Sequence, residues 1–344
     1  MKRKKILIYQ VGVIGDTIIS LPVIREIVNR HSRDEVHIMN LHFEQKTFQM
    51  SLLEELPGNI ASVRFEHFHS IRTVSGLISR IKLFLKIRRE HYDTAYLIIL
   101  YGVAKQLLYS FRFLTGIKNI FPTVFFREKH NNLLESLLIQ FEEFGFSFDR
   151  NKKLLDYPLS QAHLEKADSY WKRLKIPENR IPVALCITAV TQAKFSWSHE
   201  NYLELLKKAV PENHIFPVFL GAPEEKQLIQ PLLDELQTGA FVSDLKAVEL
   251  IALLKKCRFY LGNDTGPMHL ADSAGIPCIT LFSHQDYYKA WIPEGDHHIT
   301  LIHPQPCGEC HLQECRYGSP AKCVREITVE EVEKAVKKIL LPDQ

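Results

Sequence analysis

The chain has 344 residues and a mass of 39.9 kDa, enough for about two domains. Apolar residues make up 46% and charged residues 24%, which excludes a disordered chain, a collagen-like repeat and a small disulfide scaffold. The sequence has no apolar run of the ~18 residues that a membrane span needs, and its basic start lacks a signal-peptide cleavage site. We therefore expect a soluble, cytosolic protein.

The net charge of +3 is spread unevenly along the chain. Residues 1–160 contain 23 Lys and Arg against 16 Asp and Glu, a net charge of +7, whereas residues 161–344 carry a net charge of −4. A basic first half suits an acidic partner such as a phosphorylated lipid, a nucleic acid or a membrane surface. The same charge is equally compatible with an ordinary solvated surface.

The first 160 residues alternate short apolar runs with helical patterns. Strands are predicted at residues 6–11, 36–41, 61–65, 94–100 and 120–125, and helices at 17–30, 74–89 and 133–144. This alternation favours a parallel sheet with helices on both faces, because strands that are covered on both sides form continuous apolar runs.

The first predicted strand leads into the turn Gly12-Val-Ile-Gly-Asp16. Two glycines let the backbone approach a ligand closely, but their spacing is not that of a dinucleotide-binding fingerprint. Asp16 lies at the start of the next helix. It either caps that helix or acts as a general base at the end of the sheet where ligands bind.

The predicted helix at residues 74–89 carries five basic residues among its apolar ones. We expect its apolar side chains at Ile81, Phe84, Leu85 and Ile87 to pack in the core. A basic amphipathic helix is also typical of contact with anionic lipid. Some of the basic side chains are therefore candidates for binding an acidic ligand.

Three prolines between residues 158 and 182 bracket a polar helix at residues 163–174 and mark a domain boundary. We place an N-terminal domain at residues 1–160, a second domain at 161–327 and a final helix at 328–344, which we expect to pack back on the N-terminal domain. Thr328 and Glu331 form a capping box at the start of this helix.

The second domain repeats the alternation of the first. Strands are predicted at residues 182–188, 215–220, 240–242, 259–261 and 278–282, and helices at 201–210, 224–236, 247–255 and 266–274. The predicted fold class is α/β, with two doubly wound domains that face each other across a cleft. Ligands of such sheets bind beyond the carboxyl ends of the strands.

The segment from Tyr260 to Cys278 is the most informative one. A buried strand ends at Gly262, a turn follows, and Pro267 stands at the start of a helix, where its missing N–H costs nothing. The free amides and the dipole of this helix suit a diphosphate, to which Thr265 adds a hydroxyl. His269 lies one turn into the helix, where a single histidine is otherwise a buried core residue.

Two further strands of the second domain end in polar residues. Thr188, Thr191 and Lys194 follow one of them and can reach a phosphate, unless they form a solvated loop anchored by Trp197. Glu224 or Glu225 follows another, where an acidic residue binds ribose hydroxyls in Rossmann-type folds or simply begins a helix.

Several well-known motifs are missing from the sequence. It contains no Asp-x-Asp pair, which disfavours a metal-bound nucleotide sugar. It also contains no His-Glu-x-x-His, no Walker A and no Gly-x-Ser-x-Gly motif, which disfavours metalloproteases, P-loop enzymes and serine hydrolases.

Together these segments resemble the heptosyltransferase family of bacterial lipopolysaccharide synthesis, which are inverting, metal-independent glycosyltransferases of the GT-B type with two Rossmann-like domains. The resemblance spans nearly the whole chain, and its most specific part is the Asp-Thr-Gly-Pro-Met-His block. The matching segments are Ile6 to Asp16 with Leu21-Pro22, Gly262 to His269, Trp291-x-Pro293-x-Gly295, and the cysteine run that ends at Cys323.

The resemblance implies a role for each matching residue. Asp16 matches the general base that deprotonates the acceptor hydroxyl, and Lys194 matches the lysine that stabilises the departing diphosphate. Binding of the donor, ADP-heptose, is implied for Thr188, Glu224, Asp264, Thr265, Gly266 and His269. No catalytic cofactor is expected.

The resemblance also implies the partners. The acceptor would be a phosphorylated, Kdo-bearing lipid A, which the protein would reach as a cytoplasmic, peripheral protein at the inner membrane. No nucleic acid is expected as a partner.

The sequence departs from the family pattern in two places. The family usually has Lys-x-Trp-Pro, whereas here Lys194 stands three residues before Trp197 and Ser198 replaces the proline. The family usually has Gly-Pro after Phe282, whereas here Ser283 and His284 follow. Two alternatives therefore stay open: transfer of another nucleotide-activated sugar to a glycan or protein, and a non-catalytic nucleotide-sugar-binding protein.

The seven cysteines fall into two groups. Those in apolar runs, Cys186, Cys257 and Cys278, are expected in the core. The others are spaced C-x2-C-x4-C-x7-C, a pattern that can form a tetrahedral structural site for zinc or iron, although the spacing is tighter than in common zinc modules. These four are Cys307, Cys310, Cys315 and Cys323.

Overall fold

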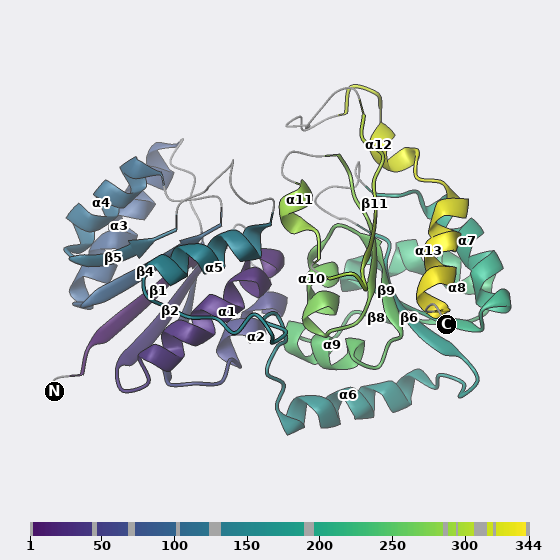
Figure 1. Cartoon of the computed structure of the whole chain (residues 1–344), viewed down its shortest axis with the longest axis horizontal. Coiled ribbons are helices and arrows are strands. Elements are labelled where there is room, and N and C mark those ends of the chain that lie inside the picture. Colours follow the sequence, from purple (N-terminus) through teal and green to yellow (C-terminus); the bar gives the residue numbers. More distant parts are fainter. Residues whose placement is uncertain are drawn as a thin grey trace. The chain divides into compact units, whose positions relative to one another are not determined.

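The computed structural model describes residues 3–42, 47–67, 73–100, 104–123, 132–188, 196–284, 288–293, 295–305, 315–318 and 321–341. Contacts within the chain divide it into two compact units, Met1–Pro158 and Leu159–Gln344. Each unit is built on one parallel sheet (Figure 1), and we call them unit 1 and unit 2.

Unit 1 contains a five-stranded parallel sheet in the order β3-β2-β1-β4-β5. Its strands are β1 (Lys5–Val11), β2 (Glu35–His42), β3 (Ile60–His67), β4 (Thr94–Ile99) and β5 (Asn119–Pro122). Its helices are α1 (Ile14–Arg30), α2 (Ser51–Glu54), α3 (Val74–Arg89), α4 (Lys105–Thr115) and α5 (Leu133–Glu143). The strand order reverses at β1, which pairs with both β2 and β4.

Unit 2 contains a six-stranded parallel sheet in the order β11-β10-β9-β6-β7-β8, which is the Rossmann order. Its strands are β6 (Ile181–Cys186), β7 (Ile215–Leu220), β8 (Ala240–Val242), β9 (Phe259–Asn263), β10 (Cys278–Leu281) and β11 (Ile299–Leu301). Its helices are α6 (Gln161–Leu174), α7 (His199–Glu212), α8 (Lys226–Leu236), α9 (Ala247–Leu254), α10 (Gly266–Ser273), α11 (Tyr288–Trp291), α12 (Lys322–Arg325) and α13 (Val329–Leu340).

Helices cover both faces of the sheet in unit 1. On one face, α3 and α4 lie side by side (Figure 1) and pack Phe84 and Phe111 against the β1 side chains Leu7 and Tyr9. The intervening β1 residues point to the opposite face and are buried as well, as is Ile8 with an exposed fraction of 0%. This two-sided burial is why the strand forms a continuous apolar run.

The α/β fold class and the predicted strands are confirmed, but the prediction misses α4, β11 and the four-residue helices α2, α11 and α12. In α4, the large side chains of Tyr109 and Phe113 are exposed, so its apolar positions do not mark a single buried stripe. β11 has only three residues, too few for a periodic pattern. α10 begins at Gly266, which makes Pro267 its second residue and not its first.

The last helix, α13, packs within unit 2. Its side chains Val332, Ala335 and Val336 are buried in the same core cluster as Leu205 of α7. The sequence suggested the N-terminal domain as its neighbour, but a helix with one strongly apolar face does not specify which apolar surface covers it. The predicted capping box is present, since the Thr328 hydroxyl accepts the Glu331 amide and the Glu331 carboxylate accepts the Thr328 amide.

Candidate active site

The strand order of unit 2 places its ligand-binding position at the carboxyl ends of β6 and β9. The two strands approach each other closely there, because a Cβ on Gly262 would lie 2.4 Å from the carbonyl oxygen of Cys186. Only glycine fits this contact. The residues that follow β6 and β9 are therefore brought together at one edge of the sheet.

Cys186 connects the ends of β6 and β9 at this edge. The Thr265 hydroxyl, after β9, lies 3.6 Å from its sulfur, and its thiol donates to the Thr188 carbonyl at 3.6 Å. The Glu225 carboxylate, after β7, is close enough to raise the pKa of this thiol further, although burial is the main cause of a pKa of about 11. Cys186 is thus a neutral core thiol, as expected, and Thr188 and Thr265 lie at one site.

The structure distinguishes between the two acids that follow β7. Glu224 is exposed, whereas Glu225 is only 7% exposed and accepts a hydrogen bond from the Ala222 amide at 2.6 Å through Oε2. Its other oxygen, Oε1, is buried and has no hydrogen-bond partner in the described part of the chain. A buried carboxylate oxygen normally accepts a hydrogen bond, so Oε1 can accept one from a water or from a ligand hydroxyl. The residue implied for donor binding was Glu224.

The Asp264-to-His269 block lies at the turn from β9 into α10. Asp264 is exposed, Thr265 is the N-cap residue, and Gly266 begins the helix. The Thr265 hydroxyl does not cap the helix, so it does not compete with a ligand for the first amides. The N-terminus of α10 thus has the features of an anion site.

His269 is buried within the same block. Its ring meets that of Trp291 in α11 edge to face, with 5.6 Å between centroids. Burial lowers the pKa of His269 to about 4, so the imidazole is neutral at pH 7. The ring is therefore buried, as expected of a core histidine, and it lies one turn into α10.

Asn263 is a site residue that the sequence reasoning did not single out. Its side chain is 1% exposed and links β9 to both ends of the segment that follows β6. The amide nitrogen donates to the Ile187 carbonyl at 3.1 Å, and the amide oxygen accepts from the Trp197 backbone at 3.0 Å. The sequence feature that could have identified Asn263 is its place at the end of a buried strand, directly before Asp264.

Between those two anchors lies the segment that contains Thr191 and Lys194, which is outside the described residues. Trp197 is the packing anchor that one interpretation expected, because it is 1% exposed and its indole N–H donates to the Ile327 carbonyl at 2.8 Å. Ser198, in place of the usual proline, caps α7 by accepting the Asn201 amide at 3.1 Å.

Asp16 lies in unit 1 as the third residue of α1, at the carboxyl end of the central strand β1. Its Oδ2 accepts the Val13 backbone N–H at 2.8 Å, so it caps the helix while remaining 6% exposed. Gly12 makes this possible, since its φ is +150° and a Cβ there would lie 2.2 Å from that of Asp16. Burial raises the pKa of Asp16 to about 6, against the Val13 hydrogen bond, which lowers it.

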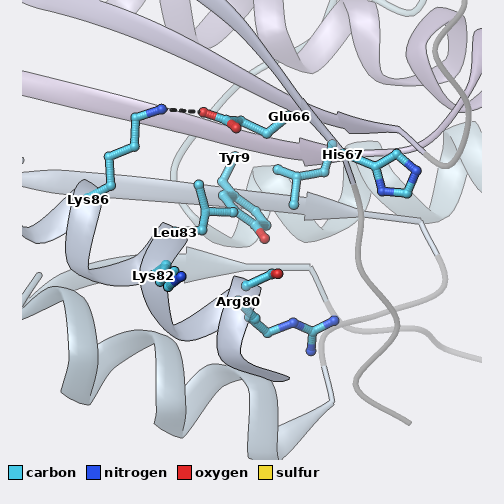
Figure 2. Close-up of a pocket in the computed structure, with 9 residues that line it drawn as sticks. Tyr9, Glu66, His67, Arg80, Lys82, Leu83 and Lys86 are labelled. Carbon is cyan, nitrogen blue, oxygen red and sulfur yellow. Dashed lines mark hydrogen bonds and ion pairs between the residues drawn. The ribbon is translucent and has the colours of Figure 1, made fainter. Parts of the chain in front are cut away.

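A pocket of about 320 Å³ lies under α3 in unit 1 (Figure 2). Arg80, Lys82 and Lys86 reach it from α3, and Lys86 forms an ion pair of 2.6 Å with Glu66 of β3. The pocket adjoins the turn before Asp16, because Leu41, which lines it, accepts the Gly12 amide at 3.0 Å. Its lining is Tyr9, Leu41, Glu66, His67, Ser79, Arg80, Lys82, Leu83 and Lys86.

The sequence matches glycosyltransferase family 9 (heptosyltransferase) over residues 127–320, which is more than half of the chain. The chain belongs to this family. The match includes the whole Asp264-to-His269 block at the carboxyl edge of the sheet in unit 2. No curated protein sequence matches the chain.

Solved structures share the fold of this family 9 chain. A glycosyltransferase family 9 protein from Veillonella parvula has a TM-score of 0.70 and 17% identity, covering 99% of this chain and 98% of that one. The Escherichia coli ADP-heptose lipopolysaccharide heptosyltransferase II has a TM-score of 0.67 and 15% identity, with 98% of each chain covered. E. coli heptosyltransferase WaaC with ADP-2-deoxy-2-fluoro heptose has a TM-score of 0.61 and 16% identity, covering 97% and 99%.

Two of the four clustered cysteines of this family 9 protein are within the described residues. Cys323 is buried in the core cluster of unit 2, and Cys315 packs against that cluster. Cys307 and Cys310 lie outside the described residues. Within the ranges that the structure describes, no three ligating side chains gather into a metal site, and no helix has the length and apolar character of a membrane span.

Proposed function

We propose that this family 9 glycosyltransferase transfers heptose from ADP-heptose to the phosphorylated, Kdo-bearing inner core of lipopolysaccharide, with inversion and without a catalytic metal. The observation that carries the proposal is the donor-side edge of unit 2. There the N-terminus of α10 and the Thr265 hydroxyl lie at the strand-order reversal of a Rossmann sheet, and the buried Glu225 carboxylate follows the neighbouring strand β7. The fold relative WaaC is known in complex with an ADP-heptose analogue.

In this proposal each group of ADP-heptose has a complementary partner. The diphosphate lies at the N-terminus of α10, near Thr265 and Gly266, where backbone amides meet its charge. The ribose hydroxyls donate to Glu225, whose Oε1 has no donor from the described residues. Glu225, and not Glu224, is therefore the acid we assign to the ribose.

Asp16 is the proposed general base. Its carboxylate takes the proton of the acceptor hydroxyl while that oxygen attacks the anomeric carbon, and the bond from that carbon to the ADP diphosphate breaks. A pKa of about 6 favours this role, because the group is still ionised at pH 7 yet is a stronger base than an ordinary aspartate. Lys194 is the proposed cation for the departing diphosphate, by resemblance alone.

The pocket under α3 is the proposed position of the acceptor's anionic groups. Three basic side chains line it against one glutamate, and it adjoins the turn that carries the base. A carboxylate or phosphate on an inner-core sugar matches this charge. The acceptor, and peripheral contact with the inner membrane, belong to the proposal.

A structural zinc or iron at the four cysteines also remains a proposal. Thiolates suit both metals, and Cys315 and Cys323 lie on the same core cluster. Elemental analysis of the purified protein should find about one metal ion per chain, and Cys323→Ser should lower that content. Metal-free protein with full stability would contradict the site.

The function is tested by thermal shift in EDTA with ADP, UDP, GDP, CDP and NAD, followed by turnover. ADP alone should raise the melting temperature, because a ligand that binds the folded state stabilises it. ADP-heptose and a Kdo-lipid A acceptor should then give ADP and the extended lipid. Stabilisation by UDP or GDP in place of ADP would show that the donor is a different nucleotide sugar. Binding of ADP without turnover on any acceptor would favour a non-catalytic protein.

A further inference from the structure

The outer faces of α3 and α4 carry large apolar side chains that are exposed to water. Of the twelve large hydrophobic side chains exposed in the described part of the chain, seven belong to these two helices. On α4, Tyr109 is 71% exposed and Phe113 is 80% exposed. The other five lie on α3, and with Tyr109 and Phe113 they form what we call the apolar face: Val74, Leu77, Ile78, Ile81 and Leu85. Single exposed apolar residues are ordinary, but a group of this size marks an interaction surface.

The five α3 residues form one stripe. Their spacing of three and four residues places them on one side of the helix, away from the side where Phe84 and Ile87 are buried. The sequence prediction put Ile81 and Leu85 in the core with those two, and the structure corrects it: Ile81 is 37% exposed and Leu85 is 42% exposed. α3 thus has two apolar sides, and the residues that the structure describes cover one of them.

The stripe on α3 and the aromatic pair on α4 belong to one surface. The two helices pack side by side through Phe84 and Phe111, whose ring centroids are 5.1 Å apart. At their ends, the Arg88 guanidinium donates to the Phe113 carbonyl at 3.4 Å. Both helices cover the same face of the sheet, so their outer sides are exposed in the same direction.

The charge of this surface has one sign. α3 and α4 contain no Asp or Glu. Their basic residues are Arg80, Lys82, Lys86, Arg88, Arg89, Lys105 and Arg112. Exposed apolar side chains bordered by basic ones, without an acid among them, are the pattern of a helix that lies in the interface of an anionic bilayer.

We propose that the α3–α4 surface docks the enzyme on an anionic lipid bilayer, with Tyr109, Phe113 and the α3 stripe inserted at the headgroup level. The exposed basic side chains outside the pocket, such as Arg89 and Lys105, bind lipid phosphates. This deepens the proposed function, since it rests on an acceptor that is anchored in a membrane. The other flank of α3 lines the pocket with Ser79, Lys82 and Lys86. A sugar that projects from the bilayer therefore meets the pocket beside the docked helix.

The test is co-sedimentation with vesicles of equal parts phosphatidylglycerol and phosphatidylcholine. The protein should pellet with these vesicles, and less so with phosphatidylcholine alone or at high salt. Tyr109→Ser with Phe113→Ser should weaken binding at least about tenfold, since two large apolar groups lose their burial. Leu228→Ser in α8, where the side chain is 45% exposed, is the matched control and should bind as the wild type does.

Activity assays separate this proposal from the function itself. The double variant should extend a water-soluble, deacylated acceptor at the wild-type rate but lose most of its activity on vesicle-embedded acceptor. Vesicle binding is measured without substrate, so it tests the docking proposal independently of heptosyl transfer. The proposal is overturned if the wild type stays in the supernatant, which would leave an acidic protein as the partner to seek. It is equally overturned if the double variant pellets as well as the wild type.

Discussion

At the carboxyl edge of the sheet in unit 2, polar side chains are buried and hydrogen-bonded to one another. At the corresponding edge of unit 1, the pocket is lined instead by basic side chains from a helix surface, such as Lys86, which is 54% exposed. The side chains of Asn263 and Cys186 are fixed in one conformation, because they are buried and cannot replace their hydrogen bonds within the protein by hydrogen bonds to water. Lysine side chains keep much of their rotamer freedom. Under the proposed function, the rigid edge suits one compact donor and the adaptable pocket suits a large acceptor.

Asp16 differs from the basic residues of that pocket, because it is buried, as Asn263 and Cys186 of unit 2 are. Asp16→Asn should lower the rate of transfer by about 10²–10⁴, the usual contribution of a general base. Stabilisation by ADP should persist, since the donor residues lie in unit 2. Glu26→Gln on the same helix is the control. A variant with wild-type turnover would remove Asp16 from the mechanism.

The rigidity of the edge in unit 2 depends on Asn263. Asn263→Ala leaves the Ile187 carbonyl and the Trp197 amide without their partner, which should cost about 3 kcal/mol of unfolding free energy. Chemical denaturation measures the loss, and ADP binding should weaken with it. Asn59→Ala, which removes an exposed amide that donates to two carbonyls of unit 1, should cost less than about 1 kcal/mol. Equal losses would show that burial does not set the difference.

The raised pKa of Asp16 predicts the pH dependence of the reaction. The turnover rate should fall below pH 6, by about tenfold per pH unit, because the protonated carboxyl cannot accept the acceptor's proton. Lowering the pH should have the opposite effect on the stability of the fold, which should rise. The folded-state pKa lies above the unfolded value of 3.8, so protonation between about pH 6 and pH 4 stabilises the fold. A turnover profile that is flat down to pH 5 would contradict the assignment.

The smallest expected effect concerns the two glutamates after β7. Glu225→Gln should weaken ADP binding about tenfold, because a charged acceptor of ribose hydroxyls is lost. Glu224→Gln should leave the affinity unchanged, since that side chain is exposed. Isothermal titration with ADP compares the two. The reverse order would restore Glu224 as the ribose acid and separate the buried carboxylate from the donor site.

The predictable part of the site is the part encoded by local pattern. A strand, a glycine turn and a helix start place Asp16 and the block from Asp264 to His269 at strand ends, and the structure has them there. The choice between Glu224 and Glu225 was not predictable, because the sequence does not show which of two adjacent side chains in a turn points into the protein. Asn263 escaped notice for a similar reason, since its hydrogen bonds to Ile187 and Trp197 span more than 60 residues of sequence.

By itself, the sequence determined the α/β class, the alternation of strands and helices and the positions of the motifs, because each depends on periodicity and turn chemistry within a short stretch. Only the tertiary structure decided which apolar positions are covered. Ile81 and Phe84 are both apolar and three residues apart on α3, yet one is 37% exposed and the other is buried. Their difference comes from the neighbouring sheet and α4, since burial depends on what packs against a helix and not on its own residues.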